Sequence, residues 1–383
     1  MELLRQNLES HIKALCLDCG SRHTGSEGEQ KAAAYIESYL KSLGVTVVSE
    51  EYPTRGWAYE YFYLYNVTQD RPVPGVSACF FSGSCDVTGQ MLFINAEELD
   101  RLETLEVQNR ICFIKHVTGP VAVNNAIAEK LEALGATAVF FISSGVAPNT
   151  KIVRSPHIQR IVTGTVDMQG LMDVLKYPTD TYYLASKAHP FDTVSRNVIA
   201  RLGSGEKKAV VGAHYDTAPL VQGANDDASG TAIVLEFARL LKDRQLPITL
   251  DLALFSAEEY VVTRGPVGSL AYVNAHKDED IRWFLAVDDY GAKVRTEALK
   301  LGHAEKLPPL KHNHPVEYTT TGGDNVSFCD AGIPAVWLYD SPTPAVIHTR
   351  LDNLDFVDFD TVTEGAQKML DLLEQLLAAD SDS

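Results

Sequence analysis

The sequence is short of positive charge and of long hydrophobic runs, and both shortages exclude classes of partner. It has 33 Lys and Arg against 51 Asp and Glu, which gives a formal net charge of −18 at pH 7. Such an acidic surface repels phosphate backbones and anionic lipid headgroups, so we expect neither nucleic acid nor a membrane as the main partner. No stretch approaches the roughly 20 consecutive apolar residues that a membrane-spanning helix needs.

Cysteine is scarce as well, and the N-terminus lacks the pattern of a secretion signal. The 383 residues include six cysteines. In a chain of this size we expect free thiols rather than a disulfide framework. The N-terminal segment is charged and amphipathic, with no continuous apolar core and no small-residue cleavage site. These features predict a cytoplasmic protein.

Apolar runs alternate with helical patterns at the start of the chain and again from Asn197 onward. Ser26-Glu-Gly-Glu29 is a capping pattern that opens a helix, and Gly44 is a natural stop for it. Strands are expected at 45–48, 210–211, 248–255, 283–287 and 334–338, and helices at 230–241 and 361–379. This alternation predicts an α/β fold, a three-layer sandwich whose mostly parallel central sheet is covered on both faces.

The character of the sequence changes after about Trp57. Residues 58–65 are rich in aromatic side chains, and strand-like runs follow at 91–94, 111–114 and 138–142, with a helical stretch at 123–134. None of these runs ends in a cluster of metal-binding residues. We therefore predict a smaller β-rich domain at 58–192, inserted into a main domain made of 1–57 and 193–383.

Residues that bind metals gather at the ends of the predicted strands of the main domain. They occur in Gly-Ala-His-Tyr-Asp at 212–216, Gly-Ala-Asn-Asp-Asp-Ala-Ser-Gly at 223–230, Ala-Glu-Glu at 257–259 and His-Thr-Arg-Leu-Asp at 348–352, and as Asp288. Loops that leave the carboxyl ends of parallel strands meet at one edge of the sheet. Imidazole and carboxylate groups are zinc ligands. A set with a shared carboxylate and a spare Glu points to hydrolysis of an amide bond assisted by two metals.

These segments, with Gly268-Ser-Leu-Ala-Tyr272 and Gly332-Ile-Pro334, resemble the di-zinc aminopeptidase family. That family includes bacterial leucyl aminopeptidases and has glutaminyl cyclases and transferrin receptor among its relatives. The resemblance covers about 1–57 and 193–383, and the segment 58–192 is similar to a protease-associated domain. It implies a sandwich of the zinc-peptidase type and a metallo-aminopeptidase that removes N-terminal residues from peptides with a free N-terminus.

Carried over residue by residue, the resemblance implies two divalent metal ions, and zinc is the metal expected. His214 and Asp288 would hold one ion. Glu259 and His348 would hold the other, and Asp226 would bridge both. Asp288, rather than Asp289, is the predicted ligand.

The resemblance also implies a proton acceptor and supporting residues. Glu258 would be the general base. Asp216 would accept a hydrogen bond from the ring of His214, and Asp352 is a candidate for the same role toward the other ligand histidine. The peptide bond between Asp226 and the next residue would be cis.

Two tyrosines, Tyr290 and Tyr318, are candidates to stabilise the oxyanion, and the sequence does not choose between them. Where the family has Ser-Asp-His, this chain has Gly323-Asp324-Asn325, so the floor of the substrate pocket differs.

Two other functions stay open on the same fold. The first is another hydrolase or a glutaminyl cyclase; cyclases tend to use one zinc, whereas all five ligands are present here. The second is a non-catalytic receptor-like binding protein; such relatives lose ligands and the base, which this chain keeps. The sequence gives neither the preferred substrate side chain nor the oligomeric state.

Overall fold

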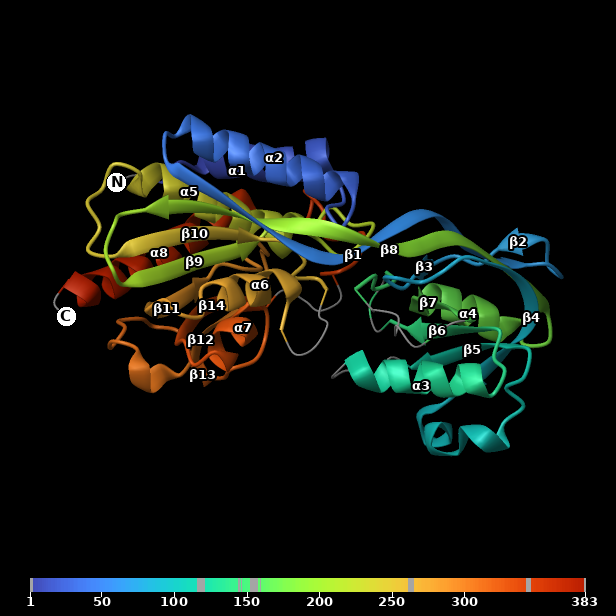
Figure 1. The fold of residues 1–383 in the computed structure, drawn as a ribbon. Helices are drawn as coiled ribbons and strands as arrows, with labels where there is room; N and C mark the ends of the chain where they lie inside the picture. Colours follow the sequence, from blue (N-terminus) through green and yellow to red (C-terminus); the bar gives the residue numbers. More distant parts are fainter. Residues whose placement is uncertain are drawn as a thin grey trace.

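The computed structural model describes residues 3–115, 121–143, 145, 147–151, 158, 160–260, 265–341 and 346–381. Within these residues, one continuous sheet of fourteen strands runs through two lobes (Figure 1). The first lobe holds both chain termini, and the second holds the middle of the N-terminal half.

The central strands of the first lobe are parallel. In order across the sheet they are β10 (Thr249–Phe255), β9 (Lys208–His214), β11 (Ile281–Ala286) and β14 (Ala335–Ser341). Next to β14, β12 (Thr296–Gly302) runs antiparallel, and β13 (Val316–Tyr318) is parallel to β12. The predicted α/β fold class is confirmed as a mixed sheet flanked by helices, with its parallel pairs mainly in the centre.

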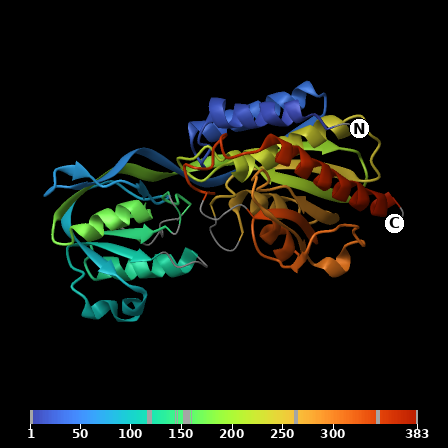
Figure 2. The same ribbon diagram turned by 180° about the vertical axis from the view of Figure 1, so that it is seen from behind.

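Helices cover both faces of this sheet. Successive side chains of a strand point to opposite faces, so Val211 and Val210 of β9 belong to different cores. Val211 packs with α1 (Arg5–Lys13), α2 (Glu27–Ser42), α5 (Ser229–Leu241) and α8 (Phe359–Ser381). Val210 packs with α6 (Val267–Ala275) and α7 (Asn325–Asp330) on the other face. Figure 2, seen from behind relative to Figure 1, shows α8 in red in front of the sheet.

The first long helix begins and ends where the sequence pattern predicts. The Ser26 side chain accepts a hydrogen bond from the backbone N–H of Glu29 at 3.1 Å, which satisfies one free donor at the N-terminus of α2. Gly44 follows the helix with φ +76°, a conformation that a residue with a Cβ adopts at a cost.

A ribbon of two long antiparallel strands joins the lobes. β1 (Thr46–Asn66) pairs with β8 (Thr181–Leu202) from end to end (Figure 1). β8 then pairs with β10 in the first lobe and with β4 (Cys85–Ile94) in the second. The predicted boundaries after Trp57 and before Thr193 fall inside this ribbon, because the strands continue where the composition changes.

The second lobe is also layered. β4, β5 (Arg110–Lys115), β6 (Ala138–Ile142) and β7 (Val162–Val166) form parallel pairs, and β3 (Val76–Ala78) closes the edge. Phe113 of β5 packs in a core with α4 (Met168–Lys176), and its neighbour Cys112 packs in a core with α3 (Val121–Ala133). Helices therefore accompany the predicted strands. The assignment of 58–192 as a separate inserted domain stays a prediction.

The described cysteines are all free thiols, as expected. Cys79 and Cys112 are fully buried in the second lobe, and burial raises the pKa of each thiol to about 12. Among the described helices, none is both long and apolar enough to cross a membrane.

Candidate metal centre

The five residues predicted as metal ligands lie together at the carboxyl ends of the central strands. His214 is the last residue of β9, and Asp288 follows β11. Glu259 follows β10, His348 follows β14, and Asp226 precedes α5. The sequence segments that carry them are far apart, and the parallel sheet brings their ends to one edge.

Asp226 lies between the two histidines and offers one oxygen to each. Its Oδ1 is 3.0 Å from Nε2 of His214, and its Oδ2 is 2.9 Å from Nε2 of His348. Asp288 Oδ1 is 3.5 Å from the same nitrogen of His214, and Glu259 Oε2 is 3.6 Å from that of His348. Among the described residues, these side chains form two groups of three potential ligands that share Asp226.

The chemistry of these groups fits divalent metal ions. Burial, with the nearby charge of Asp226, raises the pKa of Glu259 to about 7 and also raises the pKa of Asp288. Oδ1 of Asp288 is buried without a hydrogen-bond partner among the described residues, and the ammonium group of Lys151 is the cation found beside Oε2 of Glu259. Buried carboxylates require a compensating positive charge. Imidazole and carboxylate donors at this spacing are suited to zinc; the number of ions stays a prediction.

Asp216 and Asp227 hold the backbone around the two groups. Asp216 accepts hydrogen bonds from the backbone N–H of Glu258 at 3.0 Å and of Glu259 at 3.2 Å. Its Oδ1 lies 3.4 Å from Nδ1 of His214, without the geometry of a hydrogen bond. Asp227 accepts from Gly230 N at 2.7 Å, at the start of α5. The peptide bond between Asp226 and Asp227 is cis, as the resemblance implies.

Asp352 does not contact the ring of His348, so its expected role is wrong. Its two oxygens accept hydrogen bonds from the backbone N–H groups of Asn225 at 2.8 Å and of Asp226 at 3.1 Å. Burial raises the pKa of this carboxyl to about 7, with the charge of Asp226 adding to the effect. Asp352 therefore fixes the loop that presents Asp226.

A lysine that sequence reasoning missed enters the site from the second lobe. Lys151 Nζ lies 3.0 Å from Oε2 of Glu258 and 2.6 Å from Oε2 of Glu259. Burial opposes ionisation of Glu258, but Lys151 and His214 outweigh it and hold the pKa of this carboxyl below its usual value. Nothing in the sequence around Lys151 signals this contact, because docking of the second lobe creates it.

The two tyrosines considered for the oxyanion have different surroundings. The hydroxyl of Tyr290 donates to Glu297, and its ring packs against the backbone at Gly365. The side chain of Tyr318, on β13, is 77% exposed. Asp324, in the segment that departs from the family pattern, is buried, and burial raises its pKa to about 8 with a contribution from Glu258.

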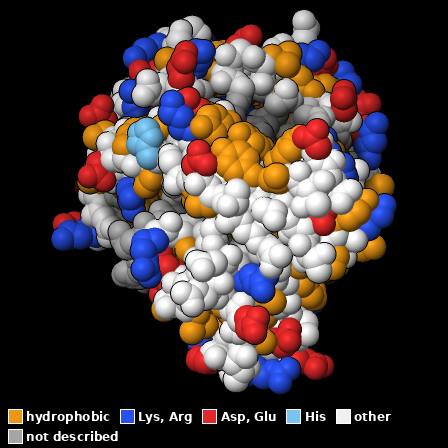
Figure 3. All heavy atoms as spheres, turned by 90° about the vertical axis from the view of Figure 1, so that its right-hand side faces the viewer, with side chains coloured by type: hydrophobic (Ala, Val, Ile, Leu, Met, Phe, Trp, Pro, Cys, Tyr) orange, Lys and Arg blue, Asp and Glu red, His pale blue; other side chains and the backbone are white. Residues whose placement is uncertain are grey.

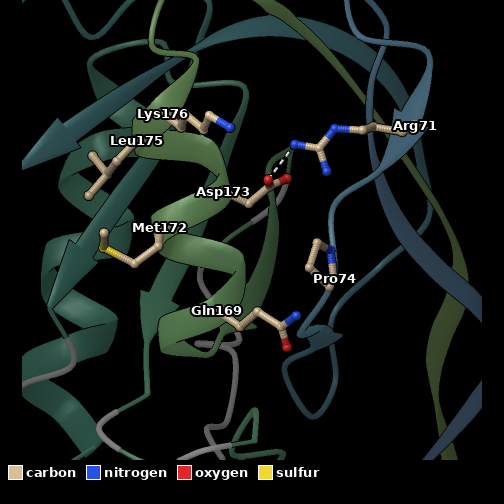
Figure 4. A pocket seen from close by; sticks show the side chains of 7 residues that line it. All are labelled: Arg71, Pro74, Gln169, Met172, Asp173, Leu175 and Lys176. Carbon is tan, nitrogen blue, oxygen red and sulfur yellow. Dashed lines mark hydrogen bonds and ion pairs between the residues drawn. The ribbon is translucent and has the colours of Figure 1, made fainter.

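A hollow beside α4 of the second lobe lacks this chemistry. It has a volume of about 650 Å³ and lies between β2 (Arg71–Pro72) and α4. Figure 4 shows Arg71 paired with Asp173 across it, with Met172 and Leu175 on the helix. In Figure 3, hydrophobic side chains gather on the upper part of this end of the molecule. The described residues place neither group of potential metal ligands here.

Comparison with known families supports the resemblance found in the sequence. Residues 197–373 match Peptidase family M28. Leucine aminopeptidase 1 of Ajellomyces capsulatus is 29% identical over 232 residues, which cover 50% of this chain and 58% of that protein. The match thus spans somewhat more than half the length of that curated relative.

Solved structures with the same fold extend over almost the whole chain. A zinc aminopeptidase from Bacillus subtilis superposes with a TM-score of 0.76 at 21% identity, covering 98% of this chain and 96% of that one. A peptidase M28 precursor from Shewanella amazonensis gives 0.78 at 20%, covering 96% and 94%. A glutaminyl cyclase from Fimbriiglobus ruber gives 0.54 at 14%, covering 98% and 96%. At these identities the likeness shows the fold, and the predicted resemblance is confirmed.

Proposed function

Because residues 197–373 match Peptidase family M28, we propose that the chain is a zinc-dependent aminopeptidase that removes N-terminal residues from peptides. The zinc aminopeptidase fold of the whole chain and the leucine aminopeptidase relatives support a zinc exopeptidase. The observation that carries the proposal is the position of Asp226 between His214 and His348, with one oxygen toward each.

The chain provides two adjacent sets of donors, and each has one histidine and one further carboxylate. His214 and Asp288 would hold one zinc ion, Glu259 and His348 the other, and Asp226 both. A bridging carboxylate suits two cations about 3.5–4 Å apart. Bound zinc would polarise the substrate carbonyl and lower the pKa of a water molecule.

Glu258 would accept the proton of the attacking water. Glu258 is only 6% exposed beside the ligand groups, and its pKa is below the usual value, so it is ionised and able to take a proton near neutral pH. Asp216 holds the backbone of Glu258 and Glu259 together, which fixes the base relative to one ligand. General base catalysis of this kind contributes about 10²–10⁴-fold.

The site contains buried carboxylates beyond the proposed metal ligands, and these suit a substrate with a free amino group. Asp324 and Glu258 are both buried, and their charges interact. A cationic α-amine placed between them would be attracted by the charge of Glu258 and would favour ionisation of Asp324, while an acetylated amine would lose that attraction and add bulk.

The test compares one peptide, Leu-Gly-Gly-amide, with its N-acetylated form, using the zinc-loaded full chain. We expect release of leucine from the free form and at least 100-fold slower cleavage of the acetylated form. Equal cleavage of both forms would instead indicate an endo-acting hydrolase.

The fold of the Fimbriiglobus ruber cyclase makes glutaminyl cyclisation the second candidate. A peptide that begins with Gln separates the two reactions. Release of free glutamine supports an aminopeptidase, whereas loss of ammonia with the peptide left whole supports a cyclase. A zinc-loaded protein that does neither and cleaves no peptide would be a binding protein. The cytoplasmic location stays a prediction that fractionation of cells tests.

A further inference from the structure

A cavity of about 310 Å³ lies between the two lobes. From the second lobe, Gly75, Thr150 and Asp167 line it. From the first lobe, Leu220 and Arg350 line it. This volume is at the lower end of the range found for ligand sites in proteins, about 300–1,000 Å³.

One residue that lines this cavity, Thr150, also contacts the candidate metal centre. Both the backbone N–H and the hydroxyl of Thr150 donate to the carbonyl oxygen of His348, at 2.9 and 3.1 Å. The next residue, Lys151, pairs with Glu258. Arg350 is two positions after His348. These contacts place the cavity beside the candidate metal centre.

Arg350 gives the cavity a positive charge that pairs with no carboxylate among the described residues. Its side chain is exposed, and among the described residues it has no ion-pair partner. The acid in the wall, Asp167, is engaged: its carboxylate accepts a hydrogen bond from Gly170 N at 2.9 Å and packs against Gly75. A guanidinium group binds a carboxylate through two parallel hydrogen bonds. In a chain of net charge −18, an unpaired cation beside the site favours an anionic ligand group.

From this arrangement we propose that the cavity between the lobes binds a carboxylate of the substrate through Arg350, so that the preferred substrates are di- and tripeptides with a free C-terminus. The inference rests on the proposed aminopeptidase function and adds the class of peptide. The metal groups receive the amino end, and Arg350 receives the other end of a short chain. The carboxylate can also come from an acidic side chain, which has the same chemistry, and the experiment separates these two sources.

The experiment measures kcat/KM of the zinc-loaded full chain for Leu-Gly-Gly as the free acid and as the C-terminal amide. We expect the free acid to be preferred by about tenfold, which corresponds to about 1.4 kcal/mol. In Arg350→Gln the ratio should fall to below about twofold, mainly through a higher KM for the free acid. Arg101→Gln, which removes an exposed arginine of the second lobe that does not line the cavity, should keep the wild-type ratio.

A third peptide, Leu-Gly-Glu-amide, identifies the source of the carboxylate. If it is cleaved no faster than Leu-Gly-Gly-amide while the free acid is preferred, the C-terminal carboxylate is the ligand, as proposed. If the Glu peptide alone is preferred, the cavity selects an acidic side chain and the short-peptide assignment is wrong.

Two outcomes would overturn the inference and leave the aminopeptidase proposal intact: equal kcat/KM for acid and amide in the wild type, or an unchanged ratio in Arg350→Gln. Failure to cleave any of these peptides or leucine p-nitroanilide, which has no carboxylate, would instead refute the aminopeptidase proposal. Metal content and circular dichroism report whether Arg350→Gln folds. If Arg350→Gln does not fold, two other measurements test the inference. They are the ratio of kcat/KM in the wild type and the ratio in Arg350→Lys, which should keep a preference for the free acid above twofold.

Discussion

Lys151 Nζ lies 3.0 Å from Oε2 of Glu258, although 107 positions separate the two residues in the chain. The contact joins the second lobe to the residue that we propose as the general base. The same ammonium group lies 2.6 Å from Oε2 of Glu259, a proposed metal ligand. A zinc ion bound to that oxygen at about 2 Å would lie close to the ammonium group. Lys151 and a metal ion at this position would therefore compete for one oxygen.

Replacing Lys151 by Met should have opposite effects on the metal-free and the metal-loaded protein. Without metal, the buried carboxylates lose a cation, and the free energy of unfolding should fall by about 1–3 kcal/mol. Zinc affinity should rise, because the competing charge is gone. Thermal unfolding with a chelator and calorimetric zinc titration measure the two effects. Lys115→Met, at an exposed lysine of the same lobe, is the control. Unchanged zinc affinity would show that the lysine and the metal do not compete.

The full chain should bind two zinc ions, and His348→Ala should retain one. His348 belongs to the group with Glu259, while the group with His214 and Asp288 keeps all its donors. Elemental analysis after exhaustive dialysis gives the stoichiometry. His189→Ala, at an exposed histidine on β8, should keep two ions. Two tightly bound ions in His348→Ala would mean that the second set of ligands is wrong.

Glu258→Gln should keep its metals and lose nearly all turnover. Glutamine has the shape of glutamate but cannot accept a proton at neutral pH, so kcat should fall by about 10²–10⁴-fold. Elemental analysis and steady-state kinetics with leucine p-nitroanilide check both parts. Glu206→Gln, in an exposed turn before β9, provides the matched control. A near-normal kcat would assign the base to another residue.

The sequence predicted which residues lie together at the candidate metal centre because each proposed ligand lies in a short motif next to an apolar strand or helix, as His214 does at the end of β9. It missed Lys151, whose neighbours carry no motif and whose position depends on how the lobes dock. It placed a domain boundary after Trp57, where composition changes, whereas the pairing of β1 with β8 continues past that point. The predicted hydrogen bond between Asp352 and the ring of His348 is absent, because both carboxylate oxygens of Asp352 accept hydrogen bonds from backbone N–H groups instead. Local sequence patterns therefore predict strands and motifs, whereas lobe docking and side-chain partners depend on long-range contacts that the sequence does not show.

Glu29 should make the stability of the fold depend on pH around neutrality. This residue of α2 is 4% exposed, and its carboxylate accepts hydrogen bonds from Gly25 N at 2.6 Å and from the hydroxyls of Ser195 and Ser256. Burial raises its pKa from 4.5 to about 7, although these hydrogen bonds act in the opposite direction. Between these two values the folded state keeps a proton that the unfolded state has released, so the stability falls as the pH rises through this window.

The variant Glu29→Gln removes this titration while keeping an acceptor oxygen for Gly25. Relative to wild type, it should gain stability between pH 4.5 and pH 7, by up to about 3 kcal/mol, since one pKa unit corresponds to 1.36 kcal/mol. Below pH 4.5 both proteins are neutral at this position, and the difference should be constant. Urea unfolding of the metal-free proteins at pH 4.5, 6 and 8 measures the change, with Glu51→Gln on β1 as the exposed control. A stability difference that is the same at all three pH values would show that Glu29 titrates normally in the folded state.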